Sequence, residues 1–320
     1  MRKYLFIVLV ALLLVGCTSL KKVEQTKELM STYYTITVYD TDEGKANNSI
    51  EKAFEEIQRI DDVLSIYKNS SEANRLNEDG FIENASYDLL YNVERSLYYA
   101  NLSDGAFDIT VQPILDLYTH TFNDLKRPPT EEEINETLIL INYKNIILSK
   151  DKKSIKLSKK GMKITLGGIA KGYAVERAID ILNKEGIQHA LVNAGGNMRA
   201  IGNKGTEDWQ IALENPRNKQ EYITIIPLNN NAVSTSGDYE RYFNENKTFH
   251  HIVNPKTGYS AIELISVTII TDNAMDADAL STSVFVLGKE KGLKLIEDLG
   301  VKGLIITREK GIIKSSGFHY

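Results

Sequence analysis

A carboxylate and two hydroxyls lie close together near residue 280, at helical spacing. Asp278 and Thr282 are four residues apart and would share one face of a helix, with Ser281 beside them. Such oxygens suit a hard cation such as Mg²⁺, which takes few protein ligands and keeps other positions for phosphates. The alternative is an exposed helix start, where acids are favoured by the helix dipole. Leu280 and the apolar run Val284–Val286 should bury this segment, which favours the metal site.

Two glycine pairs also indicate ligand binding. Gly167-Gly168 comes just before a predicted helix that contains Lys171 and Gly172, and N–H groups at such a turn can face an anion such as phosphate. The spacing excludes both the Gly-Lys-Ser/Thr phosphate loop and the G-x-G-x-x-G dinucleotide fingerprint. The second pair, Gly195-Gly196, follows a predicted strand and would let the backbone approach a ligand closely. A plain tight turn remains the alternative for each pair.

Two of the five histidines, His250 and His251, precede a Pro–Gly turn. A zinc site would need further His, Cys or Glu ligands at suitable spacing, and the sequence has none nearby. A phosphate contact or proton transfer by one histidine is therefore favoured over zinc. A surface histidine in a turn is the alternative.

The N-terminus indicates export. Arg2 and Lys3 precede an apolar run that ends just before Cys17, and the run is too short to span a bilayer. The pattern resembles a bacterial lipobox. It predicts a lipoprotein signal peptide at residues 1–16, acylation of Cys17 with chains such as palmitate, and a lipidated tether at residues 17–29. We expect an extracytoplasmic protein anchored by lipid to the bacterial cell membrane, on the periplasmic side of the inner membrane in a Gram-negative source.

Composition limits the partners. The 320-residue chain has a formal charge of −5, and removing residues 1–16 takes away two basic residues and no acid. A mildly acidic chain without a basic stripe argues against nucleic acid as a partner. Cys17 is the only cysteine, so no disulfide can form within one chain.

Helical and strand patterns alternate irregularly along the chain, which predicts an α+β fold rather than a strict βαβ series. The first helix is expected at residues 50–64, with cap candidates at residues 47–49. The other expected elements are strands at residues 33–39, 145–148, 154–157, 190–193, 209–213, 223–227, 252–253, 265–271 and 304–307, and helices at residues 87–100, 169–185, 277–286 and 289–299.

Taken together with three further motifs, these clusters resemble the ApbE family of flavin transferases, which move FMN from FAD onto a protein. The resemblance covers about residues 30–315. The matching motifs are Met30-Ser31-Thr32-Tyr33-Tyr34 for M-G-T-x-Y, Leu64-Ser65-Ile66-Tyr67 with Asn69–Glu72 and Leu76-Asn77 for the L-S-x-Y segment, and Asp104–Val111 with Pro113 for G-A-F-D-x-T-V-x-P.

The resemblance implies a two-lobed mixed sheet and helix fold over residues 30–320, with FAD in the cleft between the lobes. It implies Mg²⁺ held by a backbone oxygen near Gly168 and by Asp278 and Thr282, with Ser281 as a further ligand. His251 is the candidate for proton transfer, and Asp278 would also orient the nucleophile. The residues expected to contact FAD are Met30, Tyr67, Ala106, Phe107, Asp108, Thr165, Lys171 and Ile252.

Three positions depart from the family pattern. Thr165 replaces the usual Asp, which removes one expected ligand contact. Ser31 and Gln112 replace glycines, and these larger side chains are expected to narrow the pocket around the flavin.

The implied reaction is Mg²⁺-dependent transfer of FMN from FAD to a Ser or Thr hydroxyl of an acceptor, with release of AMP. The expected acceptor is an exported or membrane-bound redox protein. Two alternatives remain open. One is an FAD pyrophosphatase that yields FMN and AMP, with water as the acceptor. The other is a flavin-binding lipoprotein without catalysis.

Overall fold

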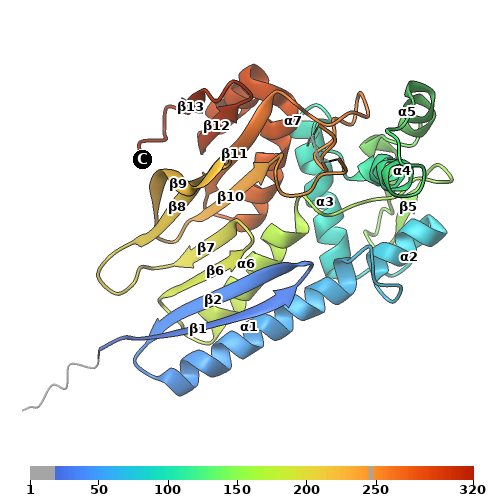
Figure 1. The fold of residues 1–320 in the computed structure, drawn as a ribbon. Helices are drawn as coiled ribbons and strands as arrows, with labels where there is room; N and C mark the ends of the chain where they lie inside the picture. The colour runs from blue at the N-terminus through green and yellow to red at the C-terminus, as the bar shows by residue number, and fades with distance from the viewer. Residues whose placement is uncertain (1–18, 245–247) are drawn as a thin grey trace, which may run out of the picture.

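The computed structural model describes residues 19–244 and 248–320. Its main element is an antiparallel sheet with the strand order β1-β2-β6-β7-β10-β11-β12-β13 (Figure 1). The predicted signal peptide and Cys17 lie outside the described residues. The strands of this sheet are β1 Lys21–Leu29, β2 Thr32–Asp40, β6 Ala190–Ala194, β7 Asn197–Ile201, β10 Ala232–Gly237, β11 Leu264–Thr271, β12 Lys302–Thr307 and β13 Ile312–Lys314.

Three long helices cover one face of the sheet: α1 Glu43–Leu64, α6 Ala170–Lys184 and α7 Ala274–Asp298 (Figure 1). Their apolar side chains form the largest core cluster with the inward residues of the sheet. The two predicted C-terminal helices are parts of α7, which is interrupted at Gly288, where φ is 79°. A residue with this φ cannot continue a right-handed helix, and glycine adopts it without steric cost.

A hairpin of β8 Trp209–Asn215 and β9 Asn218–Leu228 forms a second core cluster with residues on the other face of the sheet. Trp209 and Leu228 from the hairpin belong to this cluster with Ile270 and Leu304 from the sheet. The central strand β11 is therefore covered on both faces. This explains why its sequence is almost continuously apolar rather than alternating.

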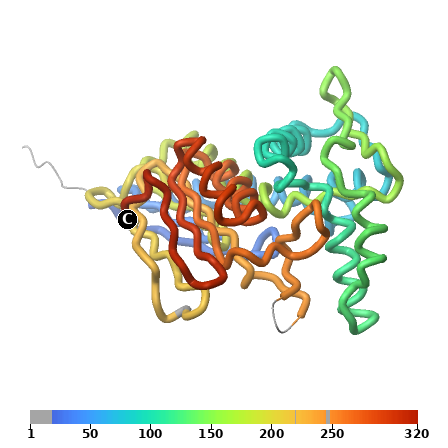
Figure 2. The backbone as a smooth tube through the Cα atoms, turned by 90° about the horizontal axis from the view of Figure 1, so that it is seen from above, coloured from blue at the N-terminus to red at the C-terminus, as the bar shows by residue number. Residues whose placement is uncertain are grey.

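A smaller lobe lies beside the sheet, as the view from above shows (Figure 2). Its own small core includes Tyr118, Ile114 and Ile134. This lobe contains α2 Glu72–Asp79, α3 Tyr87–Leu102, α4 Gln112–Asn123, α5 Glu131–Leu138 and a sheet of β3 Phe81–Ile82, β5 Ile155–Leu157 and β4 Ile146–Leu148.

The predicted α+β class is confirmed, but three local expectations are wrong. Residues 21–29 form β1 rather than a free tether. They lack an apolar pattern because β1 is an edge strand that leaves most of its side chains in solvent. The first helix begins earlier than expected, with Asp42 as its cap, because the Asp42 side chain accepts from the Lys45 N–H. Residues 252–253 contribute only a single bridge, between Val253 and Ser260.

Within the two described ranges, no helix has the length and apolar character needed to cross a bilayer.

Candidate functional site

A cleft of about 640 Å³ lies between the sheet and the smaller lobe. Every predicted FAD contact lines it, as do His251 and three of the four predicted metal-site residues, Gly168, Asp278 and Thr282. Segments from the whole chain meet here. They are the β1–β2 turn, the C-terminal end of α1, residues 106–119, residues 165–171, the C-terminal end of β10, the loop residues 240–243 and 251–255, and one face of α7.

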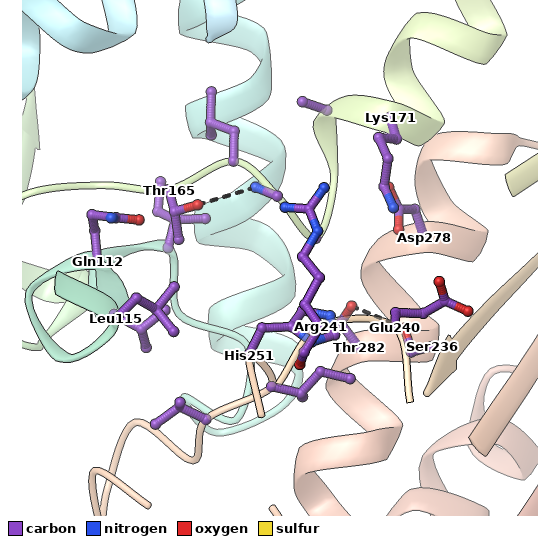
Figure 3. A pocket seen from close by; sticks show the side chains of 18 of the residues that line it. Gln112, Leu115, Thr165, Lys171, Ser236, Glu240, Arg241, His251, Asp278 and Thr282 are labelled. Carbon is purple, nitrogen blue, oxygen red and sulfur yellow. Dashed lines mark hydrogen bonds between the residues drawn. The ribbon is translucent and has the colours of Figure 1, made fainter. Parts of the chain in front are cut away.

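Asp278 lies at the crossing of α6 and α7. Its Oδ2 accepts the Gly172 N–H at 3.0 Å, and the side chain is almost fully buried. Burial raises the pKa of Asp278, while the charge of Lys171 and the hydrogen bond from Gly172 oppose that rise. Lys171 and Asp278 lie next to each other at the cleft wall (Figure 3). A buried carboxylate that faces a cleft is suited to holding a cation.

Thr282 lies one turn further along α7 and takes part in a chain of hydroxyl groups. Its Oγ1 is 3.2 Å from Ser236 Oγ (Figure 3). Ser236 Oγ is 2.8 Å from Ser281 Oγ, and Ser281 donates to the Asp278 main-chain oxygen at 2.9 Å. Because a carbonyl only accepts, Ser281 receives its bond from Ser236, and Ser236 receives its bond from Thr282. The Thr282 proton thus points to Ser236, and its lone pairs are free for another ligand.

The prediction that Ser281 binds the metal is not supported by its position. Ser281 is fully buried, is absent from the cleft wall and faces β10. Ser281 is about 100° around the helix from its neighbour Thr282, and its hydroxyl is turned to Ser236 of β10 and not to the cleft. Its place is behind Thr282, in the hydroxyl chain.

The Gly167-Gly168 turn brings the backbone to the same point. A Cβ on Gly168 would lie 3.2 Å from Thr282 Oγ1 and 3.2 Å from Phe107 Cε2, so the turn passes directly over both side chains. Helix α6 follows at once. Its N-cap residue Ile169 offers no capping side chain, but Asp278 accepts the Gly172 N–H in the first turn. Ala170 and Lys171 in its first turn line the cleft. The positive end of the α6 dipole and a lysine together make a site for an anion such as a pyrophosphate.

His251 is oriented by one main-chain oxygen. The carbonyl of Arg241 accepts both the His251 N–H at 3.2 Å and the ring Nδ1 at 3.0 Å. Nδ1 therefore carries the ring proton, and Nε2 is left as an acceptor. The pKa of His251 is lowered to about 4, mainly by burial and also by the nearby charges of Lys171 and Arg241, whereas the hydrogen bond to the Arg241 carbonyl raises it. The ring is neutral near pH 7 and can accept a proton.

His250 has a structural position. It is fully buried, its Nε2 lies 3.0 Å from the Ala261 oxygen, and its Nδ1 accepts the Ile252 N–H at 3.3 Å. This arrangement fixes the backbone at Ile252, which lines the cleft. Of the two histidines, only His251 reaches the cleft wall.

The smaller lobe and the β1–β2 turn supply the opposite wall. Tyr67 is 74% exposed, so its ring is free to stack on a flat ligand. Asp108 lines the cleft, but its carboxylate accepts bonds from Thr110 and from the Tyr143 N–H and therefore holds the local backbone. Burial raises the pKa of Asp108 in spite of those bonds. Phe107 and Ala106 are buried beside it.

The three family departures all line the cleft. Thr165 accepts the Gly167 N–H at 3.3 Å, as an Asp there could also do. Ser31 has φ of 58°, in the left-handed region that favours glycine. Gln112 donates to Asp116 at 2.7 Å.

Sequence reasoning missed Arg241, Glu240 and Ser236 in the cleft wall. Arg241 extends across the middle of the cleft (Figure 3). No local pattern marks it, since it lies in an irregular loop. The run Ser234-Thr235-Ser236 was a usable signal, because three hydroxyls at the end of a strand are unusual in a buried sheet.

Comparisons with known proteins identify the family of this chain. The model of the ApbE family matches residues 30–305. The FAD:protein FMN transferase of Haemophilus influenzae is 35% identical, with 97% of this chain and 94% of the relative covered. That of Klebsiella pneumoniae is 31% identical, with 90% of each chain covered.

Solved structures show the same fold. The ApbE protein of Thermotoga maritima superposes with a TM-score of 0.85 at 35% identity, over 92% of this chain and 97% of the other. The flavin transferase ApbE of Vibrio cholerae superposes with a TM-score of 0.80 at 28% identity, over 93% of this chain and 98% of the other.

Proposed function

This chain belongs to the ApbE family, and on that premise we propose that it is a transferase that moves FMN from FAD to a Ser or Thr hydroxyl of an acceptor protein and releases AMP. The observation that carries the proposal is the convergence on one cleft of Asp278 and Thr282, the Gly167-Gly168 turn and His251. These groups are far apart in the sequence. Together they supply a cation site, an anion site and a proton acceptor, which are the requirements of phosphoryl transfer.

The residues present fit a Mg²⁺ ion. Asp278 and Thr282 offer hard oxygen ligands, the lone pairs of Thr282 are free, and the Gly168 backbone passes beside them. In the described part of the chain, no three His, Cys, Asp or Glu side chains cluster as a metal site. A site with one acid suits a cation that takes its remaining ligands from phosphates. When bound there, Mg²⁺ would neutralise the charge of the FAD pyrophosphate.

The protein groups have distinct roles in the proposed reaction. Tyr67 stacks on the flavin, while Lys171 and the N-terminus of α6 hold the pyrophosphate. His251 Nε2 takes the proton of the acceptor hydroxyl as its oxygen attacks the FMN-side phosphorus. The bond from that phosphorus to the bridging oxygen breaks, and AMP leaves with this oxygen. The new phosphoester joins FMN to the acceptor.

We also propose that Cys17 is acylated after removal of residues 1–16, so that the enzyme acts outside the cytoplasm on exported or membrane-bound redox proteins. The basic start, the short apolar run and the cysteine directly after it support this placement.

The test is incubation of the purified protein with FAD, Mg²⁺ and a candidate acceptor. The acceptor should gain the mass of FMN, AMP should appear in equal amount, and Asp278→Ala should give neither product. Free FMN with an unlabelled acceptor would instead identify a pyrophosphatase. No AMP from either protein would leave only flavin binding and overturn the proposal.

A further inference from the structure

We propose that strand β1 is a rigid spacer between the membrane and the cleft, which places the cleft roughly 30–40 Å from the bilayer surface. This inference rests on the lipid anchor proposed at Cys17 and adds a distance and an orientation to it. The acceptor hydroxyl must then be presented at that height, on the same side of the same membrane.

The chain between Cys17 and strand β1 is short. Only Thr18, Ser19 and Leu20 separate Cys17 from β1. Leu20 is half-buried against the loop at residues 202–208, where a Cβ on Gly205 would lie 2.7 Å from Leu20 Cδ1. Three residue steps join Cys17 to Leu20, so the two Cα atoms lie within about 10 Å of each other. A linker this short holds the adjoining surface against the lipid.

Strand β1 is held along its whole length by its neighbours. Its nine residues pair with β2 from Lys21 opposite Asp40 to Leu29 opposite Thr32. Side chains tie β1 to the helix behind it, with Lys27 Nζ 2.5 Å from Glu51 Oε2 and Gln25 Nε2 2.9 Å from Asn47 Oδ1. A strand paired and backed in this way does not bend freely. At about 3.4 Å per residue it spans about 27 Å.

The two ends of β1 lie in different parts of the molecule. Its first residue is at the end of the molecule far from α4 and α5, in both views of the fold (Figures 1 and 2). Its last residue leads into the turn Met30-Ser31, and both turn residues line the cleft. One strand thus connects the membrane end of the molecule to the active end.

The charged side chains near the start of β1 favour neither neutral nor anionic lipid. Lys21 pairs with Glu43 at 3.2 Å, and Lys22 pairs with Glu24 at 2.9 Å. Because both lysines have acidic partners, the short linker and not attraction to anionic lipid sets the orientation. The orientation should therefore be the same in neutral and anionic bilayers.

The test uses the single cysteine of the chain. Once Cys17 is acylated, an introduced thiol is the only one, so a donor dye attaches at one site. Glu207→Cys lies in the exposed loop beside Leu20, and Thr119→Cys lies in α4 at the exposed edge of the cleft. Each labelled protein is placed in nanodiscs that contain an acceptor dye on the lipid headgroups.

We expect energy transfer to be several-fold more efficient from position 207 than from position 119, with and without anionic lipid. Insertion of a flexible Gly-Ser linker of about 20 residues between Ser19 and Leu20 should lower the efficiency of energy transfer from position 207. It should also reduce the difference in efficiency between positions 207 and 119. Equal transfer from both sites in the uninserted protein would show that the molecule lies flat and would overturn the proposal. Failure of the protein to stay on the discs would overturn it too, together with the anchor.

Flavin transfer to a soluble acceptor in detergent separates this inference from the enzymatic one. That reaction needs no bilayer, so the inserted protein should match the original. Loss of flavin transfer in both the original and the inserted protein would contradict the proposed activity. The energy-transfer measurement would then still test the height of the cleft above the bilayer.

Discussion

The main-chain nitrogen of Gly172 donates to the carboxylate of Asp278 across 3.0 Å, at a helix crossing that leaves no room for a side chain. A Cβ on Gly172 would fall 2.3 Å from the Ala274 oxygen and 2.8 Å from Asp278 Cβ. The position of the proposed metal ligand is therefore fixed by backbone contact between two helices.

Gly172→Ala should separate the two helices, with a loss of about 1–3 kcal/mol in the free energy of unfolding and a large loss of activity. Gly167→Ala is the matched control, since a Cβ there would meet only Thr165 Oγ1, at 3.5 Å. Denaturant unfolding of both variants measures the difference. Equal stability of Gly172→Ala and the original protein would contradict the tight crossing.

Asp278→Asn keeps the size of the side chain and an oxygen for the Gly172 N–H but removes the charge. Without metal its melting temperature should equal or exceed that of the original protein, because a buried carboxylate is costly. Added Mg²⁺ with FAD should raise the melting temperature of the original protein only. The rate of flavin transfer by Asp278→Asn should be lower than that of the original protein by about 10²-fold or more. A Mg²⁺-dependent shift in the variant would show that Asp278 is not a ligand.

Ser281→Ala tests the hydroxyl chain behind Thr282. Loss of this hydroxyl leaves Ser236 free to reorient and to donate to Thr282, so the affinity for Mg²⁺ should fall about 10-fold. Thr282→Val, which removes the proposed ligand itself, should cost more. Titration of activity with Mg²⁺ compares them. If Ser281→Ala loses as much as Thr282→Val, Ser281 is a direct ligand after all.

His251→Gln should lower transfer at pH 7 by about 10²–10⁴-fold, because the proton acceptor is lost. It should also change the pH dependence of stability. The folded histidine has a pKa of about 4, against an ordinary value of 6.5. Between these values the unfolded chain binds the extra proton, so acid destabilises the original protein there.

Melting temperatures measured from pH 7 to pH 4 should therefore fall less steeply for His251→Gln than for the original protein. Parallel curves would contradict the neutral, buried state of this ring.

Arg217, Asp238 and Arg308 hold the loop that carries Arg241. Asp238 is almost fully buried and binds Arg217 through two bonds of 2.9 and 2.6 Å, whereas Arg308 lies 3.5 Å away. Arg217→Ala leaves a buried carboxylate poorly paired and should cost about 3 kcal/mol. Arg308→Ala should cost less than about 1 kcal/mol. Chemical denaturation ranks the two, and the reverse order would show that Arg308 is the main partner.

The sequence predicted most of the residues that meet at the cleft, but not which of them reach its wall. Asp278 and Thr282 were placed together by helical spacing, and Gly168 and His251 by their motifs. Ser281 was misplaced because spacing within a helix does not show which face another strand covers. Arg241 was missed because its loop is held by distant partners such as Arg217, and such contacts leave no local pattern.

Strand β1 was missed for a different reason. An edge strand with one neighbour buries few side chains, so its sequence resembles that of a soluble linker. Only its pairing with β2 distinguishes the two.

The cleft is closed by residues from near both ends of the chain, with Met30 on one wall and Thr282 on another. The ribosome adds residues in order from the N-terminus, so a growing chain contains Met30 long before it contains Thr282. An N-terminal portion that stops before Thr282 lacks part of the site. The site therefore forms only after most of the chain has been made, and a product truncated before Thr282 should be inactive.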